Sequence, residues 1–214
     1  MGYWNRFMCR WRLHSSMIRI ERIVNSLYQS NSYIIQCEEY DWVWLIDVGD
    51  TERIQEWLNS HNLSLKGVLL THTHYDHIYG LNEVNMLFPN LIIYTSPEGR
   101  ESLYDEKWNF SRYHHTPFKF SGGNVAELCD GDKIELWPNI TMKAFKTPGH
   151  DWSCLSYIVS KMLFTGDSYI PGTKTVTFFP KSNKIEAEKS LLKIKNIPSI
   201  EIIYPGHGLS LIHI

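Results

Sequence analysis

The chain has 214 residues, long enough for one large domain with a substantial core. With 43% hydrophobic and 21% charged residues it has the composition of an ordinary globular protein, and no apolar run approaches the ~20 residues of a membrane-spanning helix. The formal net charge of −2 gives no sign of a nucleic-acid-binding surface, so we expect neither nucleic-acid nor membrane partners.

Residues 1–16 differ from the remainder of the chain. They carry Arg6, Arg10 and Arg12 but no acidic residue, and they lack the apolar segment that a secretory signal requires. We predict an N-terminal extension outside the fold, with a short organellar transit peptide as the alternative, and a single domain over residues 17–214.

The first part of this domain is predicted to be rich in β-structure. Residues 18–20, 32–35 and 42–46 alternate in polarity or are continuously apolar, which predicts three strands separated by polar turns. Residues 51–60 predict a helix, because apolar side chains recur on one face and capping residues precede them. That face consists of Ile54, Trp57 and Leu58, and the cap would be Asp50 or Thr51.

The segment Thr71–His77 reads Thr-His-Thr-His-Tyr-Asp-His and directly follows a predicted apolar strand. Imidazole and carboxylate groups bind zinc, iron or manganese in proteins. Because alternate side chains of an extended segment point the same way, His72 and His74 can reach one ion together. Asp76 and His77 lie where the chain turns into the next predicted helix, and they can serve an adjacent ion. The sequence therefore predicts a metal centre at this strand end.

Residues 104–123 form the one long irregular segment of the predicted structure. A strand over 91–94 and a short helix from Pro97 precede it. The segment is too rich in aromatic residues for disorder, so we expect either a substrate-facing wall or a flap packed on the sheet. Its histidines, His114 and His115, are expected to pack or to be exposed rather than to bind metal.

In the second half, predicted strands repeatedly end in a glycine turn that carries a histidine or an aspartate. Three turns share this pattern, and their polar residues are His150, Asp167 and His207. One such turn is weak evidence, but three of them downstream of an H-x-H-x-D-H motif indicate one site built from several loops. A helix over 184–195 is predicted between the last two turns, with Asn183 as its N-cap and an apolar pattern made by Ile185, Leu191, Leu192 and Ile194.

The four cysteines are far apart in the sequence and form no C-x-x-C pair: Cys9, Cys37, Cys129 and Cys154. This pattern predicts buried free thiols in a reducing compartment, and hence a cytoplasmic protein. The oligomeric state is left open by the sequence.

The ordered set T-H-T-H-Y-D-H, T-P-G-H, T-G-D and P-G-H resembles that of the metallo-β-lactamase-fold hydrolases, and most closely their small glyoxalase-II-like branch. The resemblance covers about residues 18–210. It implies an α+β fold, a four-layer αββα sandwich with the metals at one edge of the two sheets. It also implies one metal held by His72, His74 and His150, another held by Asp76, His77 and His207, and Asp167 as the bridge.

This resemblance implies a binuclear metal-dependent hydrolase that cleaves an ester, thioester, lactone or amide of a small-molecule substrate with a metal-bridging hydroxide. Two divalent ions are expected as cofactors, zinc first and iron or manganese as alternatives. Asp76 would orient the hydroxide or carry its proton to the leaving group. Asp47, at the end of a predicted strand, would support a ligand or simply stabilise a turn.

Departures from the family pattern bear on the substrate. The best-known β-lactamase subclass has a non-histidine residue at the position of His77. Glyoxalase II continues with a helical domain that helps to bind glutathione, whereas seven residues follow His207 here, so a glutathione thioester is not the expected substrate. Tyr169 lies one residue short of the position at which lactonases place a catalytic tyrosine. Tyr169 and Lys174 are therefore candidate substrate-binding residues.

Two other functions are compatible with parts of the pattern. A mononuclear iron oxygenase of the persulfide dioxygenase type resembles this fold and would use only His72, His150 and Asp167. A catalytically idle scaffold is disfavoured, because it has no physical need for seven costly polar groups in one place. Metal content and oxygen consumption separate the hydrolase from the oxygenase.

Overall fold

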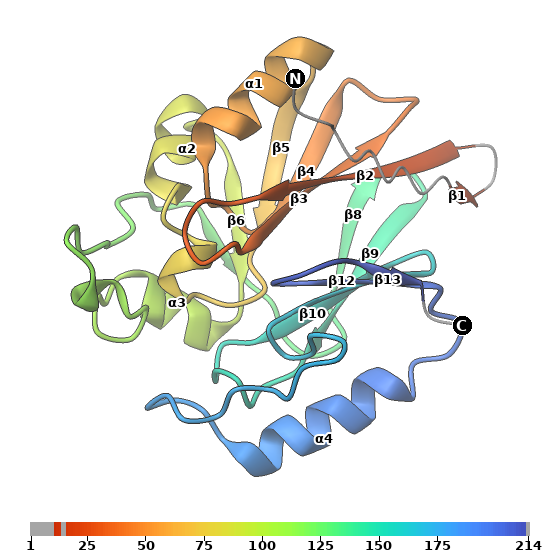
Figure 1. Ribbon diagram of the computed structural model, residues 1–214. Helices are drawn as coiled ribbons and strands as arrows, with labels where there is room; N and C mark the ends of the chain where they lie inside the picture. The colour runs from red at the N-terminus through yellow and green to blue at the C-terminus, as the bar shows by residue number, and fades with distance from the viewer. Residues whose placement is uncertain (1–10, 14–15, 213–214) are drawn as a thin grey trace, which may run out of the picture.

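The computed structural model describes residues 11–13 and 16–212, and two β-sheets lie at its centre (Figure 1). In this part of the chain the first sheet has seven strands in sequential order. They are β1 (Trp11–Leu13), β2 (Ser16–Val24), β3 (Asn31–Cys37), β4 (Trp42–Ile46), β5 (Ser64–Leu69), β6 (Ile92–Thr95) and β7 (Val125–Glu127). Pairing is antiparallel from β1 to β4 and parallel from β4 to β7.

The second sheet has six strands among the described residues, in the order β13-β12-β11-β10-β9-β8. They are β8 (Lys133–Trp137), β9 (Ile140–Lys146), β10 (Leu155–Val159), β11 (Met162–Gly166), β12 (Ile202–Pro205) and β13 (Leu211–Ile212). Its strands pair antiparallel except β11 and β12, which are parallel. This parallel pair brings the loops that follow β11 and β12 to the same edge.

Helices cover the outer face of each sheet (Figure 1). α1 (Thr51–His61), α2 (Leu81–Leu87) and α3 (Pro97–Leu103) pack on the first sheet, and α4 (Lys184–Lys195) packs on the second. Two short 3₁₀ helices, η1 (Tyr75–His77) and η2 (Ser111–Tyr113), lie in loops of the first half. The predicted α+β fold, a four-layer αββα sandwich, is therefore confirmed.

The core explains why the central strands are apolar on both faces. Tyr33 and Ile35 of β3 point into the cluster between the sheets, whereas Ile34 points into the cluster under the helices. Strands that are covered on both faces are expected to be continuously apolar, and β3 is buried along nearly its whole length. This packing holds the strand ends, and hence the loops that follow them, in fixed positions.

Several helix predictions are confirmed, and some of their details are wrong. Asn183 caps α4, since its side chain accepts hydrogen bonds from the first turn. Ile185 and Leu192 of that helix are exposed, at 64% and 62%. Asp50 stands at the N-cap of α1, but its carboxylate binds Ser26 rather than the helix amides.

The predicted N-terminal extension, residues 1–16, lies mostly outside the described residues. Within it, Trp11–Leu13 forms β1, which pairs with β2 at the edge of the first sheet. The division of the chain into an extension and a domain over 17–214 stays a prediction. Cys9 also lies outside the described residues. Cys37 and Cys154 are buried as predicted, whereas Cys129 is exposed.

Candidate metal centre

The predicted ligands come together at the carboxyl ends of strands from both sheets. The loop after β5 carries the H-x-H-x-D-H motif, and the loops after β9, β11 and β12 carry the remaining ligands, which are His150, Asp167 and His207. Parallel strands that end at one edge bring their loops together, as they do at ligand sites of other α/β sheets. The structure thus joins residues from 72 to 207 in one cluster.

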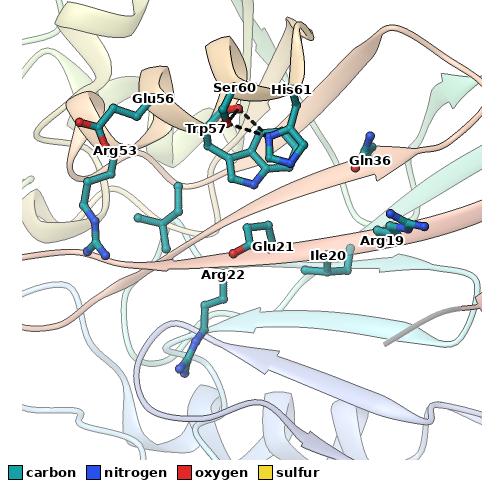
Figure 2. Close-up of a pocket in the computed structure, with 11 residues that line it drawn as sticks. Arg19, Ile20, Glu21, Arg22, Gln36, Arg53, Glu56, Trp57, Ser60 and His61 are labelled. Atoms are coloured by element: carbon teal, nitrogen blue, oxygen red, sulfur yellow. Dashed lines mark hydrogen bonds between the residues drawn. The ribbon is translucent and has the colours of Figure 1, made fainter. Parts of the chain in front are cut away.

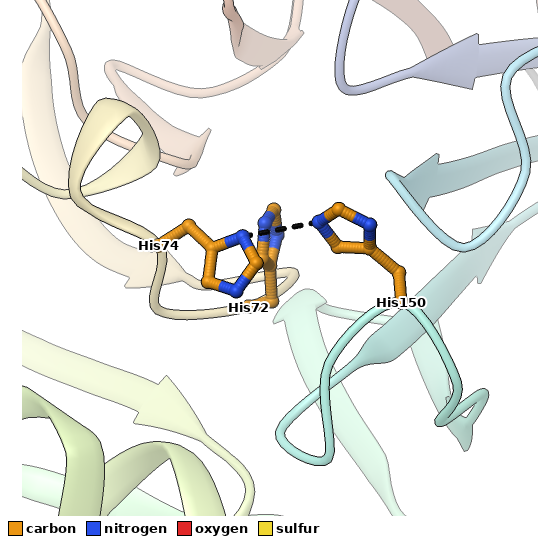
Figure 3. Close-up of side chains that lie close together, drawn as sticks. All are labelled: His72, His74 and His150. Carbon is orange, nitrogen blue, oxygen red and sulfur yellow. Dashed lines mark hydrogen bonds between the residues drawn. The ribbon is translucent and has the colours of Figure 1, made fainter. Parts of the chain in front are cut away.

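Three histidines form the first ligand set. His72, His74 and His150 each offer one ring nitrogen, and these atoms lie within 4.8 Å of one another. Figure 3 shows His150 approaching the other two rings from the opposite loop, with its Nε2 3.0 Å from Nδ1 of His74. The three side chains are almost completely buried. The arrangement matches the set that the sequence predicts for one metal.

The second set is formed by Asp76, His77 and His207, whose ligand atoms also lie within 4.8 Å of one another. Nε2 of His207 is 3.3 Å from Nε2 of His77 and 3.3 Å from Oδ2 of Asp76. Asp167 lies between the two sets. Its Oδ2 is 3.5 Å from His150 Nε2 and 3.4 Å from His207 Nε2, and its Oδ1 is 3.6 Å from His77 Nε2. Asp167 is thus in the position expected of a bridging ligand.

Gly206, in the predicted P-G-H turn, is required by this close packing. A Cβ atom at Gly206 would lie 2.1 Å from Oδ1 of Asp167 and 2.9 Å from Cε1 of His77. Any side chain there would displace the Asp167 carboxylate. The turn therefore needs glycine for space, directly before the candidate ligand His207.

Carboxylates lie behind two of the histidines, His77 and His74. Asp47 is buried, and its Oδ2 accepts from Nδ1 of His77 at 2.9 Å. The same carboxylate accepts from the Thr71 amide at 2.7 Å and the Thr71 hydroxyl at 2.6 Å, so its position is fixed. These contacts give Asp47 the supporting role, one of the two that the sequence allowed. Asp151, which the sequence analysis missed, lies with Oδ2 3.4 Å from Nε2 of His74.

Two of the remaining histidines use main-chain carbonyls as partners, and Nδ1 of the third, His72, lies 3.2 Å from the Thr71 hydroxyl. Nδ1 of His150 donates to the carbonyl of Val176 at 3.1 Å, and Nδ1 of His207 donates to the carbonyl of Tyr28 at 3.1 Å. In metal sites, such partners fix the tautomer and the ring orientation of the ligand. All these contacts leave the opposite ring nitrogen directed at the cluster.

Burial and nearby charge shift the pKa of four of these histidines, two downward and two upward. Burial lowers the pKa of His72 well below its ordinary value and lowers that of His150 to about 4, so both are neutral and able to bind a cation. Burial also lowers the pKa of His77, but nearby carboxylates, Asp76 first, outweigh it and raise the pKa to about 9. The carboxylates of Asp167 and Asp76 likewise raise the pKa of His207 to about 10. The carboxylates of the second set therefore keep His77 and His207 protonated near neutral pH, and a metal ion bound there would take the place of these protons.

The residues fit a divalent metal. In the described part of the chain, His72 Nε2 and Asp167 Oδ1 are buried without a hydrogen-bond partner. Leaving a buried polar atom unpaired costs ~1–3 kcal/mol, and a cation would use the lone pairs of both atoms. Five imidazoles and two carboxylates are the donors that zinc, iron and manganese accept.

The remaining candidates lie outside these ligand sets. Tyr169 packs against the hydrophobic cluster under α4, and its carbonyl accepts from the Thr165 hydroxyl. Lys174 is exposed. Their predicted roles toward a substrate stay predictions. The ring of His114 lies against Tyr75, with 4.6 Å between centroids, in agreement with its predicted packing role.

A separate groove of about 700 Å³ lies between α1 and β2 (Figure 2). Three arginines line it, and each already has a partner: Arg19 pairs with Glu38, Arg22 donates to a carbonyl of the C-terminal loop, and Arg53 donates to a carbonyl of β2. None of the seven metal-type ligands lines this groove. It is therefore distinct from the candidate metal centre.

Residues 25–207 match the sequence model of the metallo-beta-lactamase superfamily, and the chain belongs to this superfamily. A hydroxyacylglutathione hydrolase of Pseudoalteromonas translucida is 31% identical over 164 residues, which are 77% of this chain and 55% of that protein. A probable metallo-hydrolase of Streptococcus pyogenes is 27% identical over 219 residues, which are 98% of this chain and 91% of that protein. The chain spans 55% and 60% of the length of the first two hydroxyacylglutathione hydrolases that it matches.

Solved structures confirm the fold. The BLEG-1 B3 metallo-beta-lactamase aligns with a TM-score of 0.82 and 26% identity, over 90% of this chain and 93% of that chain. TTHA1623 in a di-iron-bound form aligns at 0.78 and 22% identity, over 90% and 94%. ETHE1 from Myxococcus xanthus aligns at 0.71 and 22% identity, over 89% and 76%. The resemblance to the metallo-β-lactamase fold and to glyoxalase-II-like proteins, expected from the sequence, is thus confirmed.

Among the described residues, no helix combines the length and the apolar character needed to cross a membrane.

Proposed function

We propose that the chain is a binuclear metal-dependent hydrolase that cleaves an acyl bond of a small molecule, with thioesters and esters as the first substrates to test and lactones and amides as further ones. The observation that supports this most strongly is the pair of ligand sets joined by Asp167. A single-ion site would not need Asp76 and His207, since the first set and Asp167 already offer four ligands. Relatives named hydroxyacylglutathione hydrolase and metallo-hydrolase support the same reaction class.

Two divalent ions, zinc first, would supply a water that is ionised near neutral pH and positive charge for the developing oxyanion. His72, His74 and His150 would hold one ion, and Asp76, His77 and His207 the other, with Asp167 shared. The supporting partners behind the rings keep the ligand nitrogens aimed inward before any ion arrives. Little rearrangement is then needed on binding.

Asp76 has the position and charge for proton transfer. Burial raises its pKa, but the neighbouring His77 and His207 outweigh this and lower the pKa below its ordinary value, and bound cations would lower it further. The carboxylate is therefore ionised at neutral pH. Oδ2 can accept the proton of the attacking water and release it to the leaving group, which is the proton shuttle that an acyl transfer requires.

The test is hydrolysis by metal-free protein reconstituted with zero, one or two equivalents of Zn²⁺. We expect the activity on an acyl thioester or ester to require the second equivalent. In parallel, the same protein loaded with Fe²⁺ is given glutathione persulfide while oxygen is monitored. Oxygen consumption at one iron per chain, without hydrolysis in any zinc form, would replace the hydrolase with the iron oxygenase built on His72, His150 and Asp167.

A further inference from the structure

Two phenylalanine rings lie directly against the first ligand set. Phe110 belongs to the irregular segment 104–123, and Phe179 belongs to the loop between β11 and α4. The ring centroid of Phe110 is 4.8 Å from that of His74, and the Phe179 centroid is 5.2 Å from that of His74. The two phenylalanines also contact each other, with 5.2 Å between centroids. We call Phe110 and Phe179 the phenylalanine pair.

The backbone holds Phe110 in an unfavourable conformation. Its φ of 62° lies in the left-handed region, which a bulky side chain adopts at a cost of ~1–3 kcal/mol. Buried side chains on both sides of it enforce this conformation. Asn109 donates to the Phe118 carbonyl at 3.0 Å and accepts from the Ser111 amide at 2.9 Å, and the Ser111 hydroxyl accepts from the Phe118 amide at 2.7 Å. The ring is therefore presented to the metal centre by a rigid loop.

The surroundings of the phenylalanine pair are aromatic. Phe178 is 80% exposed and lies 4.6 Å from Phe179, and Tyr113 is 73% exposed and stacks 6.4 Å from Phe110, as measured between ring centroids. A nearby cation, Lys181, is engaged over the ring of Trp108. An exposed apolar surface next to a polar cluster is typical of a ligand-binding site. The chemistry offered here is apolar contact.

The position of the phenylalanine pair assigns it to one part of a substrate. Asp76 lies on the side of His77 and His207, and the leaving group must approach Asp76 to receive its proton. The pair lies on the opposite side, against His74 and His150. A substrate whose carbonyl carbon is between the two ligand sets would thus place its acyl group on the phenylalanine pair.

We propose that Phe110 and Phe179 bind the acyl group of the substrate and that this group is apolar, either aromatic or a branched or medium-length alkyl chain. This inference rests on the proposed hydrolase function. The pair selects among acyl groups by burying apolar area and by ring stacking, and it does not take part in bond cleavage. Phe110 and Phe179 are specificity-determining residues.

The experiment compares phenylacetyl and acetyl thioesters of one thiol, N-acetylcysteamine, with the zinc-loaded protein. We expect wild type to favour the phenylacetyl substrate in kcat/KM. Phe110→Ala and Phe179→Ala should each lower the ratio of kcat/KM for phenylacetyl to kcat/KM for acetyl by ~10- to 100-fold, mainly through KM for phenylacetyl. The matched control is Phe145→Ala, which removes a half-buried ring from β9.

A second readout does not depend on activity. Calorimetry measures the affinity of the zinc-loaded protein for the products phenylacetate and acetate, and the alanine variants should lose the preference for phenylacetate. Phe110→Leu, which keeps an apolar side chain, should retain part of it if Phe110→Ala unfolds. Unchanged selectivity in both readouts overturns the role of the pair. If wild type hydrolyses neither thioester but prefers phenylacetate and the variants do not, the proposed function fails and the binding site stands.

Discussion

Replacement of Asp47 by asparagine tests how the metal centre is organised. The Asp47 carboxylate accepts three hydrogen bonds, two from Thr71 and one from Nδ1 of His77. Asparagine at this position is nearly the same size and keeps an oxygen for the Thr71 amide. Its NH₂ group, however, would face the N–H of His77. The NH₂ group would also face the Thr71 hydroxyl, which can turn to accept from it, so the change leaves only the His77 contact with two facing donors and opens no cavity.

The expected magnitude follows from the two ways in which His77 can respond. Either two donors face each other in a buried site, which costs ~1–3 kcal/mol, or the ring changes tautomer. The second response puts the proton on Nε2, the atom that lies 3.3 Å from His207 and belongs to the second ligand set. Loss of such supporting partners lowers metal affinity by about 10- to 100-fold, or about 1.4–2.8 kcal/mol.

The assay is a titration of metal-free protein with Zn²⁺ in competition with a chromophoric chelator. Asp47→Asn should weaken one of two binding steps by this factor and leave the other, assigned to the first ligand set, unchanged. Asp41→Asn, at an exposed turn before β4, is the control and should match wild type. Equal affinity of both steps in Asp47→Asn and wild type would refute the supporting role of Asp47.

Three other predictions concern the same site. Asp151→Asn should weaken the binding step of the first set by about 10- to 100-fold, because Asp151 lies behind His74; the same competition titration measures it, and a loss in the second step instead would contradict the assignment. Asn31→Ala should lower the free energy of unfolding in urea by ~1–3 kcal/mol, since the buried Asn31 amide donates to the carbonyls of Pro205 and Gly208 at 3.0 Å each; a smaller change than ~0.5 kcal/mol would contradict it. Removal of metal with a chelator should lower the melting temperature, and calorimetry with and without added Zn²⁺ should show a rise that depends on zinc concentration; a melting temperature independent of zinc would contradict a metal site in the folded chain.

The candidate ligands could be predicted from the sequence because each of them follows the end of a strand. A rigid strand end followed by a short loop restricts where the side chains can lie. The arrangement of the polar residues in Thr71–His77 could therefore be predicted from their spacing. His150, Asp167 and His207 repeat the same local pattern of strand, glycine turn and polar residue. The family resemblance then supplied the division into two sets, which the distances support.

The supporting partners could not be predicted in the same way. The acceptors for His150 and His207 are main-chain carbonyls of Val176 and Tyr28, and every residue has such a carbonyl, so no sequence signal marks these two. Asp151 carried a usable signal, because it directly follows a ligand and its Oδ1 accepts from the Ser153 amide two residues later, as aspartates in tight turns do. Asp151 could therefore have been predicted from this turn.

The segment 104–123 combines features of both roles predicted for it, the wall and the flap. Phe118 and Phe120 are buried in the cluster between the first sheet and its helices, so this part is a flap packed on the sheet. Phe110 contacts His74, so the other part is a wall of the site. Aromatic residues suit either environment, and only the hydrogen bonds around Asn109 decide which ring points where.

Metal analysis tests most directly whether two ions occupy the two ligand sets. Protein purified without chelator is analysed for zinc, iron and manganese, as wild type and as the double variant Asp76→Ala with His207→Ala. We expect about two ions per chain in wild type and about one in the double variant, which keeps the first set intact. One ion per chain in both proteins would contradict a two-ion site.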